Sequence, residues 1–247
     1  MRGRLGLLIS CFVVGSAWGA VYDVDRTDDT AAATACTAAA SDCSLRGAII
    51  AANANPGADT INVPAGTYAL TILGAGEDNA ATGDLDIRDD LTILGAGAAT
   101  TIVDGSGIDR VFHSDPAGTG TITVSIQDVT VTNGATVVIS FVLANGGAIR
   151  NGSANTATAN AAGTLTLTNC VVQGSSTPRD GGGIANTGTL HLVHTTVTGN
   201  TASQNGGGLA QEDIGTLSIT DSTISGNGAP QGGGLFSGYF RDRKSVV

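Results

Sequence analysis

The stretch that decides the fold is GGGIANTGTLHLVHTTVTGN, residues 181–200, and a second copy follows as GGGLAQEDIGTLSITDSTISGN, residues 206–227. The glycine clusters of successive repeats begin at Gly181, Gly206 and Gly232, so the clusters are 25 and 26 residues apart. A period of this length is typical of solenoids, in which each repeat forms one coil and contacts only its neighbours. The sequence therefore predicts a repetitive architecture.

The composition favours β-strands. Only 4% of the residues are aromatic, 37 of the 247 are glycine, and Lys occurs once and Glu twice. Glycine does not follow the strict three-residue period of collagen. Apolar residues alternate within each repeat, and one repeat cannot bury such a face alone. We therefore expect an all-β, right-handed parallel β-helix of about seven coils over residues 59–240, with backbones paired in parallel from coil to coil.

Equivalent residues of successive coils should lie above one another inside the solenoid. We expect three interior columns, which are Leu165, Leu190 and Leu217; Leu167, Leu192 and Ile219; and Val172, Val197 and Ile224. Cys170 falls at the position of Thr195 in the next repeat, and we expect a small buried side chain there because no basic neighbour activates the thiol. Asn200 and Asn227 fall at matching corners, where stacked amides can hydrogen-bond from coil to coil.

Residues 1–19 have the pattern of a secretory signal peptide. A basic start precedes an apolar stretch over residues 5–15, and Ala17 and Gly19 are small residues at the positions that signal peptidase reads. The apolar stretch is too short to span a bilayer comfortably. A lipoprotein-like run ends at Cys11, but the apolar stretch continues beyond it. We therefore expect a secreted or cell-surface protein with no transmembrane helix in the mature chain.

The charge of the mature chain argues against nucleic acid as a partner. Removing residues 1–19 takes away Arg2 and Arg4 and leaves 9 basic against 21 acidic side chains, a formal charge of −12. Binding to nucleic acid or to an anionic membrane surface needs clustered Lys and Arg. The expected partner is instead an extracellular glycan or another surface macromolecule.

Residues 20–58 are expected to form a cap at the start of the solenoid. Cys36 and Cys43 enclose a short loop, and in an exported protein a disulfide between them is the leading interpretation. An apolar face at helical spacing follows, made by Leu45, Ala48, Ile49 and Ala52. Asp42 or Ser44 can cap the start of this helix. Its apolar face would cover the open edge of the first coil.

Several short motifs near the N-terminus carry a family likeness. They are CSLRGAI at residues 43–49, AAN at 51–53, GADTI at 57–61 and PAGTY at 64–68. Together they resemble the CSLREA domain over about residues 21–110. That module occurs near the start of exported bacterial proteins, so the resemblance implies export. Gly47 departs from the family pattern, which has Glu at this position.

The second half carries another likeness. Gly146–Ile149 matches the Gly-Gly-Ala-Ile element of polymorphic outer-membrane proteins, and the later repeats are similar to right-handed parallel β-helix repeats. The resemblance implies a surface-exposed or secreted bacterial protein, often large and often ending in an anchor or sorting domain. Residues 241–247 abandon the repeat in mid-coil, and we expect them to be a non-native or truncated tail of a longer natural chain.

The candidate chemistry lies in a group of carboxylates with two nearby cations. The candidates for polysaccharide cleavage are Asp84, Asp86, Asp89, Asp90, Asp104 and Asp109, with Arg88 or Arg110 as the cation. Hydrolysis of a glycosidic bond needs two carboxylates at a defined separation. The candidate ligands of a calcium ion, the one cofactor considered, are Asp84, Asp86, Asp89 and Asp90. The alternative is that these are solvated turn residues, since Asp is common in turns for backbone reasons.

The histidines and glycine loops give no further site by spacing. His191 and His194 are three residues apart, which on one strand places them on opposite faces, and His113 stands alone. Neither Gly74–Gly76 nor Gly95–Gly97 is completed to the Gly-x-Gly-x-x-Gly of a nucleotide-binding loop. No Ser-His-Asp arrangement can be argued from spacing.

The sequence favours a non-catalytic, exported β-helix with an adhesin-like or stalk role that binds glycans along its flank. The alternative is a pectate-lyase-like polysaccharide lyase or hydrolase, because parallel β-helices support both kinds of function. A third interpretation is a purely structural fragment of a larger, autotransporter-like protein.

Overall fold

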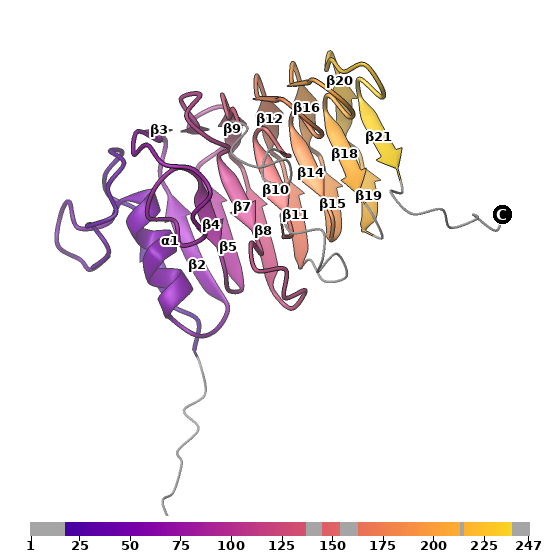
Figure 1. The fold of residues 1–247 in the computed structure, drawn as a ribbon. Helices are drawn as coiled ribbons and strands as arrows, with labels where there is room; N and C mark the ends of the chain where they lie inside the picture. Colours follow the sequence, from indigo (N-terminus) through magenta and orange to yellow (C-terminus); the bar gives the residue numbers. More distant parts are fainter. Residues whose placement is uncertain (1–17, 137–144, 154–162, 213–214, 239–247) are drawn as a thin grey trace, which may run out of the picture.

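The computed structural model describes residues 18–136, 145–153, 163–212 and 215–238. Strands dominate these residues, and one helix lies at the N-terminal end of a regular stack of coils (Figure 1). The pairs between named strands are all parallel. The fold is therefore an all-β parallel β-helix, as predicted. The expectations for residues 1–17 and for the tail at 241–247 lie outside the described residues.

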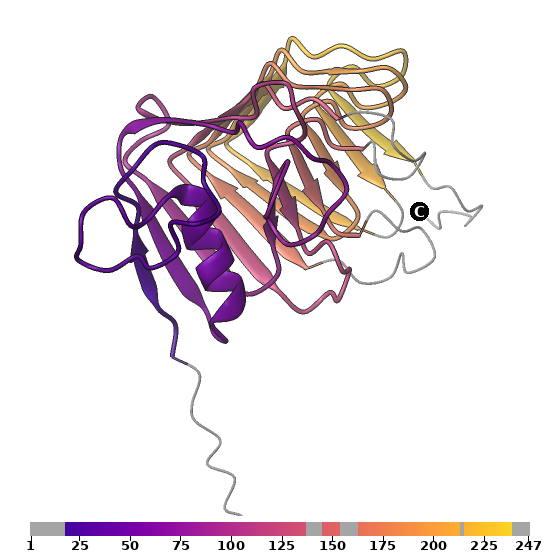
Figure 2. The same ribbon diagram turned by 60° about the vertical axis from the view of Figure 1, so that its left-hand side comes forward.

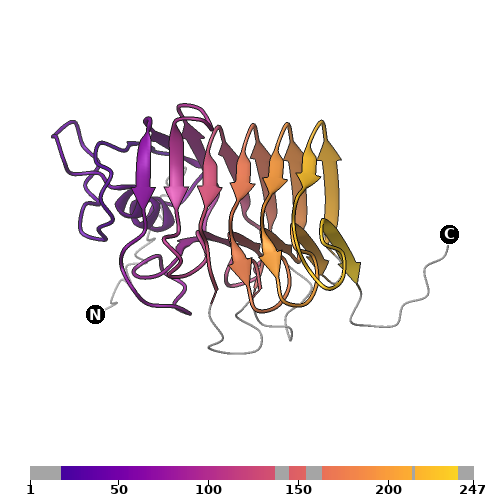
Figure 3. The same cartoon turned by 90° about the horizontal axis from the view of Figure 1, so that it is seen from above.

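Three long sheets run along the solenoid, and each takes one strand from every coil (Figure 3). The first sheet contains β1 (Val21–Asp23), β2 (Asp59–Val63), β5 (Leu91–Gly95), β8 (Thr123–Gln127), β11 (Thr164–Thr168), β15 (Thr189–Val193) and β19 (Thr216–Thr220). The second sheet contains β4 (Leu85–Ile87), β7 (Phe112–Ser114), β10 (Ile149–Asn151), β14 (Ile184–Asn186), β18 (Leu209–Glu212) and β21 (Leu235–Gly238). The third contains β3 (Gly66–Ala69), β6 (Thr101–Asp104), β9 (Thr130–Thr132), β12 (Val171–Gln173), β16 (Thr196–Thr198) and β20 (Thr223–Ser225). A short fourth sheet pairs β13 (Ser176–Thr177) with β17 (Thr201–Ala202).

The coils differ in length. Along the first sheet, residues in register from coil to coil are Asp59, Leu91, Val124, Leu165, Leu190 and Leu217. Successive coils therefore take 32, 33, 41, 25 and 27 residues. The described residues contain six coils, from β2 to β21, instead of the expected seven, because the earlier coils carry longer loops.

The three predicted interior columns are present. The register pairs their members from coil to coil. The members in the two inner coils are fully buried, namely Leu165, Leu190, Leu167, Leu192, Val172 and Val197. In the last described coil Leu217 and Ile224 are partly buried, and Ile219 is 41% exposed. These three lie at the end of the stack, where no further described coil covers them.

Side-chain amides link the coils in two places. At the corner predicted from the repeat, Asn227 Oδ1 accepts hydrogen bonds from the backbone N–H of Asn200 (2.9 Å) and from its Nδ2 (3.1 Å). A second ladder, which we did not predict, lies inside the second sheet. There Asn151 Nδ2 donates to Asn186 Oδ1 (2.8 Å), and Asn186 Nδ2 donates to Gln211 Oε1 (2.7 Å). These amides bridge neighbouring coils within the solenoid.

The one free cysteine among the described residues is Cys170, which is buried in the interior. Its Sγ lies 3.3 Å from the carbonyl oxygens of Ile126 and of Thr168. Burial raises the pKa of this thiol to about 11. At neutral pH such a thiol is protonated and a poor nucleophile, in keeping with the small buried side chain that we expected.

Helix α1 (Leu45–Ala54) covers the N-terminal end of the stack (Figure 2). Ser44 is its N-cap, and Ser44 Oγ accepts from the Gly47 backbone N–H at 2.9 Å. The buried residues of α1 include all four predicted positions, Leu45, Ala48, Ile49 and Ala52. The helix contacts β2 and β4 of the first coil. It therefore lies over the open end of the apolar spine, as predicted.

Two further features complete the N-terminal end. Cys36 and Cys43 form the predicted disulfide. Strand β1, which the sequence did not predict, pairs in parallel with β2 and begins the first sheet. The first coil is thus protected by a strand as well as by a helix.

At position 47 the backbone of Ala33 approaches so closely that only glycine fits. A Cβ at this position would lie 1.9 Å from the carbonyl oxygen of Ala33, and that oxygen accepts from the Ser44 backbone N–H at 3.2 Å. Position 47 therefore has no room for a side chain larger than hydrogen.

We expect Gly47→Ala to lower the free energy of unfolding by about 1–3 kcal/mol, because the new methyl group must displace backbone. Helix propensity alone predicts the opposite sign, with a gain of about 1 kcal/mol for alanine. Denaturant unfolding of the two proteins measures the sign. A Gly47→Ala protein more stable than the unchanged chain would contradict the close approach.

Candidate functional site

A column of polar residues is buried on the outer face of the second sheet. In the middle of β4, β7 and β10, Asp86, His113 and Arg150 lie in register from coil to coil. Each side chain is at most 2% exposed. The core side of the same strands is occupied by residues such as Leu85 and Phe112. Charged and polar groups on a covered face are costly unless they are paired, so this column is the first place to look for function.

An ion pair lies beside the start of this column. Arg110 Nε donates to Asp84 Oδ2, and both side chains are buried. Burial raises the pKa of Asp84 to about 7, although the nearby Arg110 guanidinium opposes the shift. Burial also raises the pKa of Asp109, whose Oδ1 accepts from the Arg110 backbone N–H at 2.8 Å. Two of the predicted catalytic carboxylates are thus held in a buried cluster around a cation.

The ring of His113 has a defined orientation. Its Nε2 lies 3.1 Å from the carbonyl oxygen of Gly152. A carbonyl can only accept, so Nε2 carries the proton, and Nδ1 of the neutral ring presents a lone pair. Burial, together with the positive charge of Arg110, lowers the pKa of His113 to about 3. The neutral form is therefore the resting one at neutral pH.

Two carboxylates face His113 Nδ1. Asp86 Oδ1 lies 3.4 Å from it and Asp78 Oδ1 lies 4.0 Å from it. The other oxygen of Asp86 accepts from the Ala80 backbone N–H at 2.9 Å, and burial raises the pKa of Asp86 to about 8. Asp78 is largely exposed, whereas the other two are buried. Among the described residues, these three form the one group of His, Cys, Asp or Glu side chains with metal-ligand spacing.

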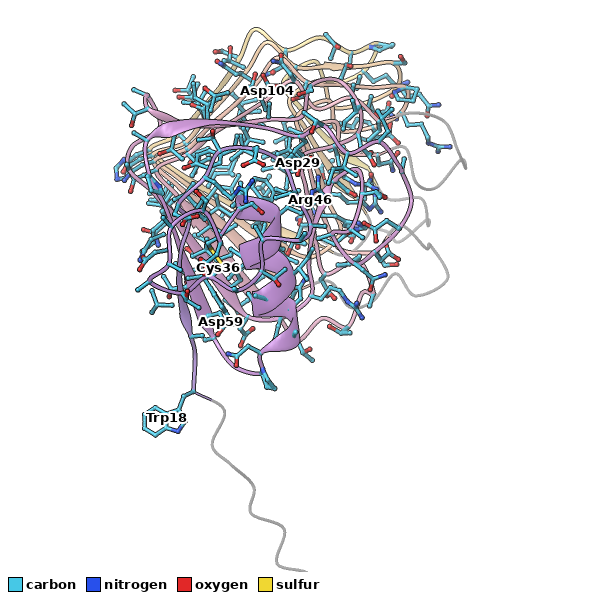
Figure 4. The ribbon with its side chains drawn as sticks, turned by 90° about the vertical axis from the view of Figure 1, so that its left-hand side faces the viewer. Trp18, Asp29, Cys36, Arg46, Asp59 and Asp104 are labelled. Carbon is cyan, nitrogen blue, oxygen red and sulfur yellow. A yellow bond between two sulfur atoms is a disulfide. The ribbon has the colours of Figure 1, made fainter. Side chains whose placement is uncertain are left out.

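Arg46 holds the loop that carries Asp78 against the first coil. Its guanidinium pairs with Asp29, and it donates to the carbonyl oxygens of Ala80 (2.9 Å), Gly83 (2.7 Å) and Asp84 (3.2 Å). Figure 4 shows Arg46, in the first turn of α1, next to Asp29. The side chain of Arg46 thereby joins α1, the N-terminal segment and the loop before β4.

The four predicted calcium ligands have separate partners. Asp84 pairs with Arg110, and Asp86 faces His113. Asp89 Oδ1 accepts from the Asp90 backbone N–H at 2.8 Å, and Asp90 Oδ1 accepts from the Thr123 backbone N–H at 2.6 Å. Only Asp86 belongs to the metal-ligand group found among the described residues. Asp89 and Asp90 have the backbone-capping role of turn carboxylates.

The other candidates are also dispersed. Arg88 Nη1 donates to Asn79 Oδ1 on the surface. His191 lies on β15, whereas His194 follows that strand at a positive φ of 49° and is exposed. Because His194 lies outside the strand, the expectation that the two histidines point to opposite faces of one strand does not apply to it. Neither histidine belongs to the metal-ligand group within the described ranges.

Sequence reasoning missed Asp78 and the pairing of His113. Asp78 lies in a polar loop without regular pattern, and His113 had no visible partner. The signal that would have found the pair is the coil-to-coil register that sets His113 beside Asp86. That register is hidden in the sequence because the first coils lack the glycine clusters of the later ones.

A second feature is an open hollow at a corner of the coils, which we call the Asp104 hollow. It has a volume of about 430 Å³ and is lined by Asp104, Ser106, Gly107, Asn133, Gly134, Ala135, Gly174 and Ser176. Asn133 Nδ2 donates to both oxygens of Asp104 (3.2 and 3.1 Å), and the Ser106 backbone N–H donates to Asp104 Oδ1 (2.8 Å). Figure 4 places Asp104 at the edge of the coils, away from Asp59.

Comparison with protein-family models, curated proteins and solved structures gives no match to this chain. Among the described residues, no helix reaches the length and apolar character that a membrane crossing requires. The buried column and the Asp104 hollow are therefore the two features of the structure that bear on function.

Proposed function

We propose that the protein is an exported or cell-surface β-helix without catalytic activity, which binds an extracellular glycan or surface macromolecule along its flank in an adhesin-like or stalk role. The observation that carries this proposal is the Asp104 hollow, an open polar site at a corner shared by several coils. The signal-like residues 1–19 and the resemblance of the next segment to the CSLREA domain support export.

The chemistry of the hollow suits sugar hydroxyl groups. The carboxylate of Asp104 can accept hydrogen bonds, and the amide of Asn133 can both accept and donate them, so together they can pair with adjacent sugar hydroxyls. Asp104 is held by Asn133 and by the backbone of Ser106, so little side-chain freedom is lost when a ligand binds. The hollow is open, and an extended polymer can cross it without entering a closed cavity.

The burial of Asp84 and Asp86, two of the candidate catalytic carboxylates, argues against a lyase or hydrolase that would use this pair. Glycosidic hydrolysis needs two carboxylates that flank the scissile bond. Asp84 and Asp86 are 1% and 0% exposed, and Asp84 is already paired with Arg110. A polysaccharide chain cannot contact these two buried side chains in the described conformation.

Glycan-array binding with a matched pair of variants tests the proposal. We expect Asp104→Asn to weaken binding of the recognised glycan by about tenfold, the loss of one charge-assisted hydrogen bond. The control is Asp128→Asn, because Asp128 also accepts from a neighbouring asparagine, Asn169 Nδ2 at 3.2 Å, at another corner. Equal binding by both variants, or release of cleaved glycan by the unchanged chain, would refute the proposal.

A further inference from the structure

We propose that Asp78, Asp86 and His113 form a binding site for a divalent transition-metal ion of the zinc class, which ties the loop before β4 to the first two coils. This site is independent of the Asp104 hollow and of the glycan-binding role. It draws its ligands from the loop, from β4 and from β7.

Two buried ligand atoms lack a partner. His113 Nδ1 and Asp86 Oδ1 are fully buried, and neither has a hydrogen-bond partner among the described residues. They face each other at 3.4 Å, and with Nε2 protonated and Asp86 ionised both atoms are acceptors. In that state the two buried lone pairs repel each other and have lost their hydration. A cation between them removes both penalties.

The separation suits the coordination distances of zinc. Zinc–nitrogen and zinc–oxygen bonds of about 2.0–2.1 Å at tetrahedral angles place the two ligand atoms about 3.4 Å apart. The distance between His113 Nδ1 and Asp86 Oδ1 has this value. Asp78 Oδ1 lies 4.0 Å from the same nitrogen, and its exposed side chain can approach the ion by rotation. Three protein ligands leave a fourth position for water.

The two buried ligands are also oriented by hydrogen bonds at their other polar atoms. Protein-bound metal sites commonly fix a ligating imidazole through a hydrogen bond from its other nitrogen to a carbonyl oxygen. His113 Nε2 has this contact with Gly152, and Asp86 Oδ2 is held by the Ala80 backbone N–H. Both buried ligands are therefore oriented before an ion arrives, and the exposed Asp78 provides the side from which it enters.

The local charge and the donor set select the kind of ion. Glu77 and Asp78 both act on Asp86 with negative charge, and this charge favours a cation. Arg110 opposes the cation, but its own charge is paired with Asp84. One imidazole nitrogen with two carboxylates suits first-row transition metals. Calcium prefers six to eight oxygen ligands, so the ion differs from the one expected from the aspartates alone.

Equilibrium dialysis of the chelator-treated, folded chain against Zn²⁺ tests the site. We expect about one Zn²⁺ per chain, a rise in the melting temperature on binding, and a d–d absorption spectrum of low-symmetry four-coordinate type when Co²⁺ replaces Zn²⁺. A chain that binds neither ion would overturn the proposal, and a proton shared between Asp86 and His113 would then be the better account of the pair.

A variant pair separates ligation from general charge. Asp78→Asn removes a proposed ligand from an exposed position, and we expect it to weaken Zn²⁺ binding by at least about tenfold with an unchanged circular dichroism spectrum. Glu77→Gln removes the same charge from the same loop and should change the affinity less than about threefold. Equal weakening by the two substitutions, or none by Asp78→Asn, would contradict the assignment. Asp104→Asn should leave Zn²⁺ binding unchanged.

Discussion

Replacing Arg46 with methionine is expected to lower the free energy of unfolding by about 3–5 kcal/mol, because it removes one partner of a buried ion pair and leaves the other charge unpaired. The side chains of Arg46 and Asp29 are 0% and 1% exposed. Without the guanidinium, Asp29 remains as a buried charge, and the carbonyl oxygens of Ala80 and Gly83 lose their donors. Denaturant unfolding followed by circular dichroism measures the change.

The chain offers a matched control for this effect. Arg26 and Asp28 form a two-bond ion pair of the same kind, but their side chains are 31% and 57% exposed. Arg26→Met should change stability little, because exposed pairs are well solvated when separated. Equal destabilisation by the two substitutions would mean that burial of the Arg46 pair is not the source of its importance.

Leu190→Ala should destabilise the protein by about 3–5 kcal/mol, since it empties a fully buried site in the middle of an interior column. Leu190 lies in register between Leu165 and Leu217, so the cavity cannot be closed by movement at an open end. The same substitution at the partly buried Leu217 should cost clearly less. Thermal and denaturant unfolding of the two variants give the order, and a larger loss for Leu217→Ala would contradict the described stacking.

The later coils could be predicted from sequence because their repeats have nearly constant length. Register between Leu165, Leu190 and Leu217 follows from aligning one repeat with the next. The first three coils could not be aligned by a constant spacing, since their loops add 7 to 16 residues to the shortest spacing, that from Leu165 to Leu190. The strand β1 was missed for a related reason, because three residues carry too little pattern to identify a strand.

The candidate site was predicted only in part. Asp86 was identified as a candidate ligand, but its partners Asp78 and His113 depend on a loop conformation and on the register of β4 with β7. The spacing of Asp84, Asp86, Asp89 and Asp90 gave no information about which of them are buried. In the structure the buried Asp84 pairs with Arg110, whereas Asp89 and Asp90 accept hydrogen bonds from backbone N–H groups. The need for glycine at position 47 could likewise not be predicted, because it depends on the tertiary contact with the backbone of Ala33.

Cysteine cross-linking in a Cys170→Ser background tests the parallel stacking of coils most directly. Thr166 and His191 are register partners on β11 and β15. Adjacent strands lie about 4.8 Å apart, within the Cα separation that a disulfide accepts. The described fold predicts that Thr166→Cys with His191→Cys forms an intrachain disulfide under mild oxidation, whereas Thr166→Cys with Ser218→Cys, two coils apart, does not. A cross-link between positions 166 and 218 in the absence of one between 166 and 191 would contradict the parallel stacking and the order of the coils.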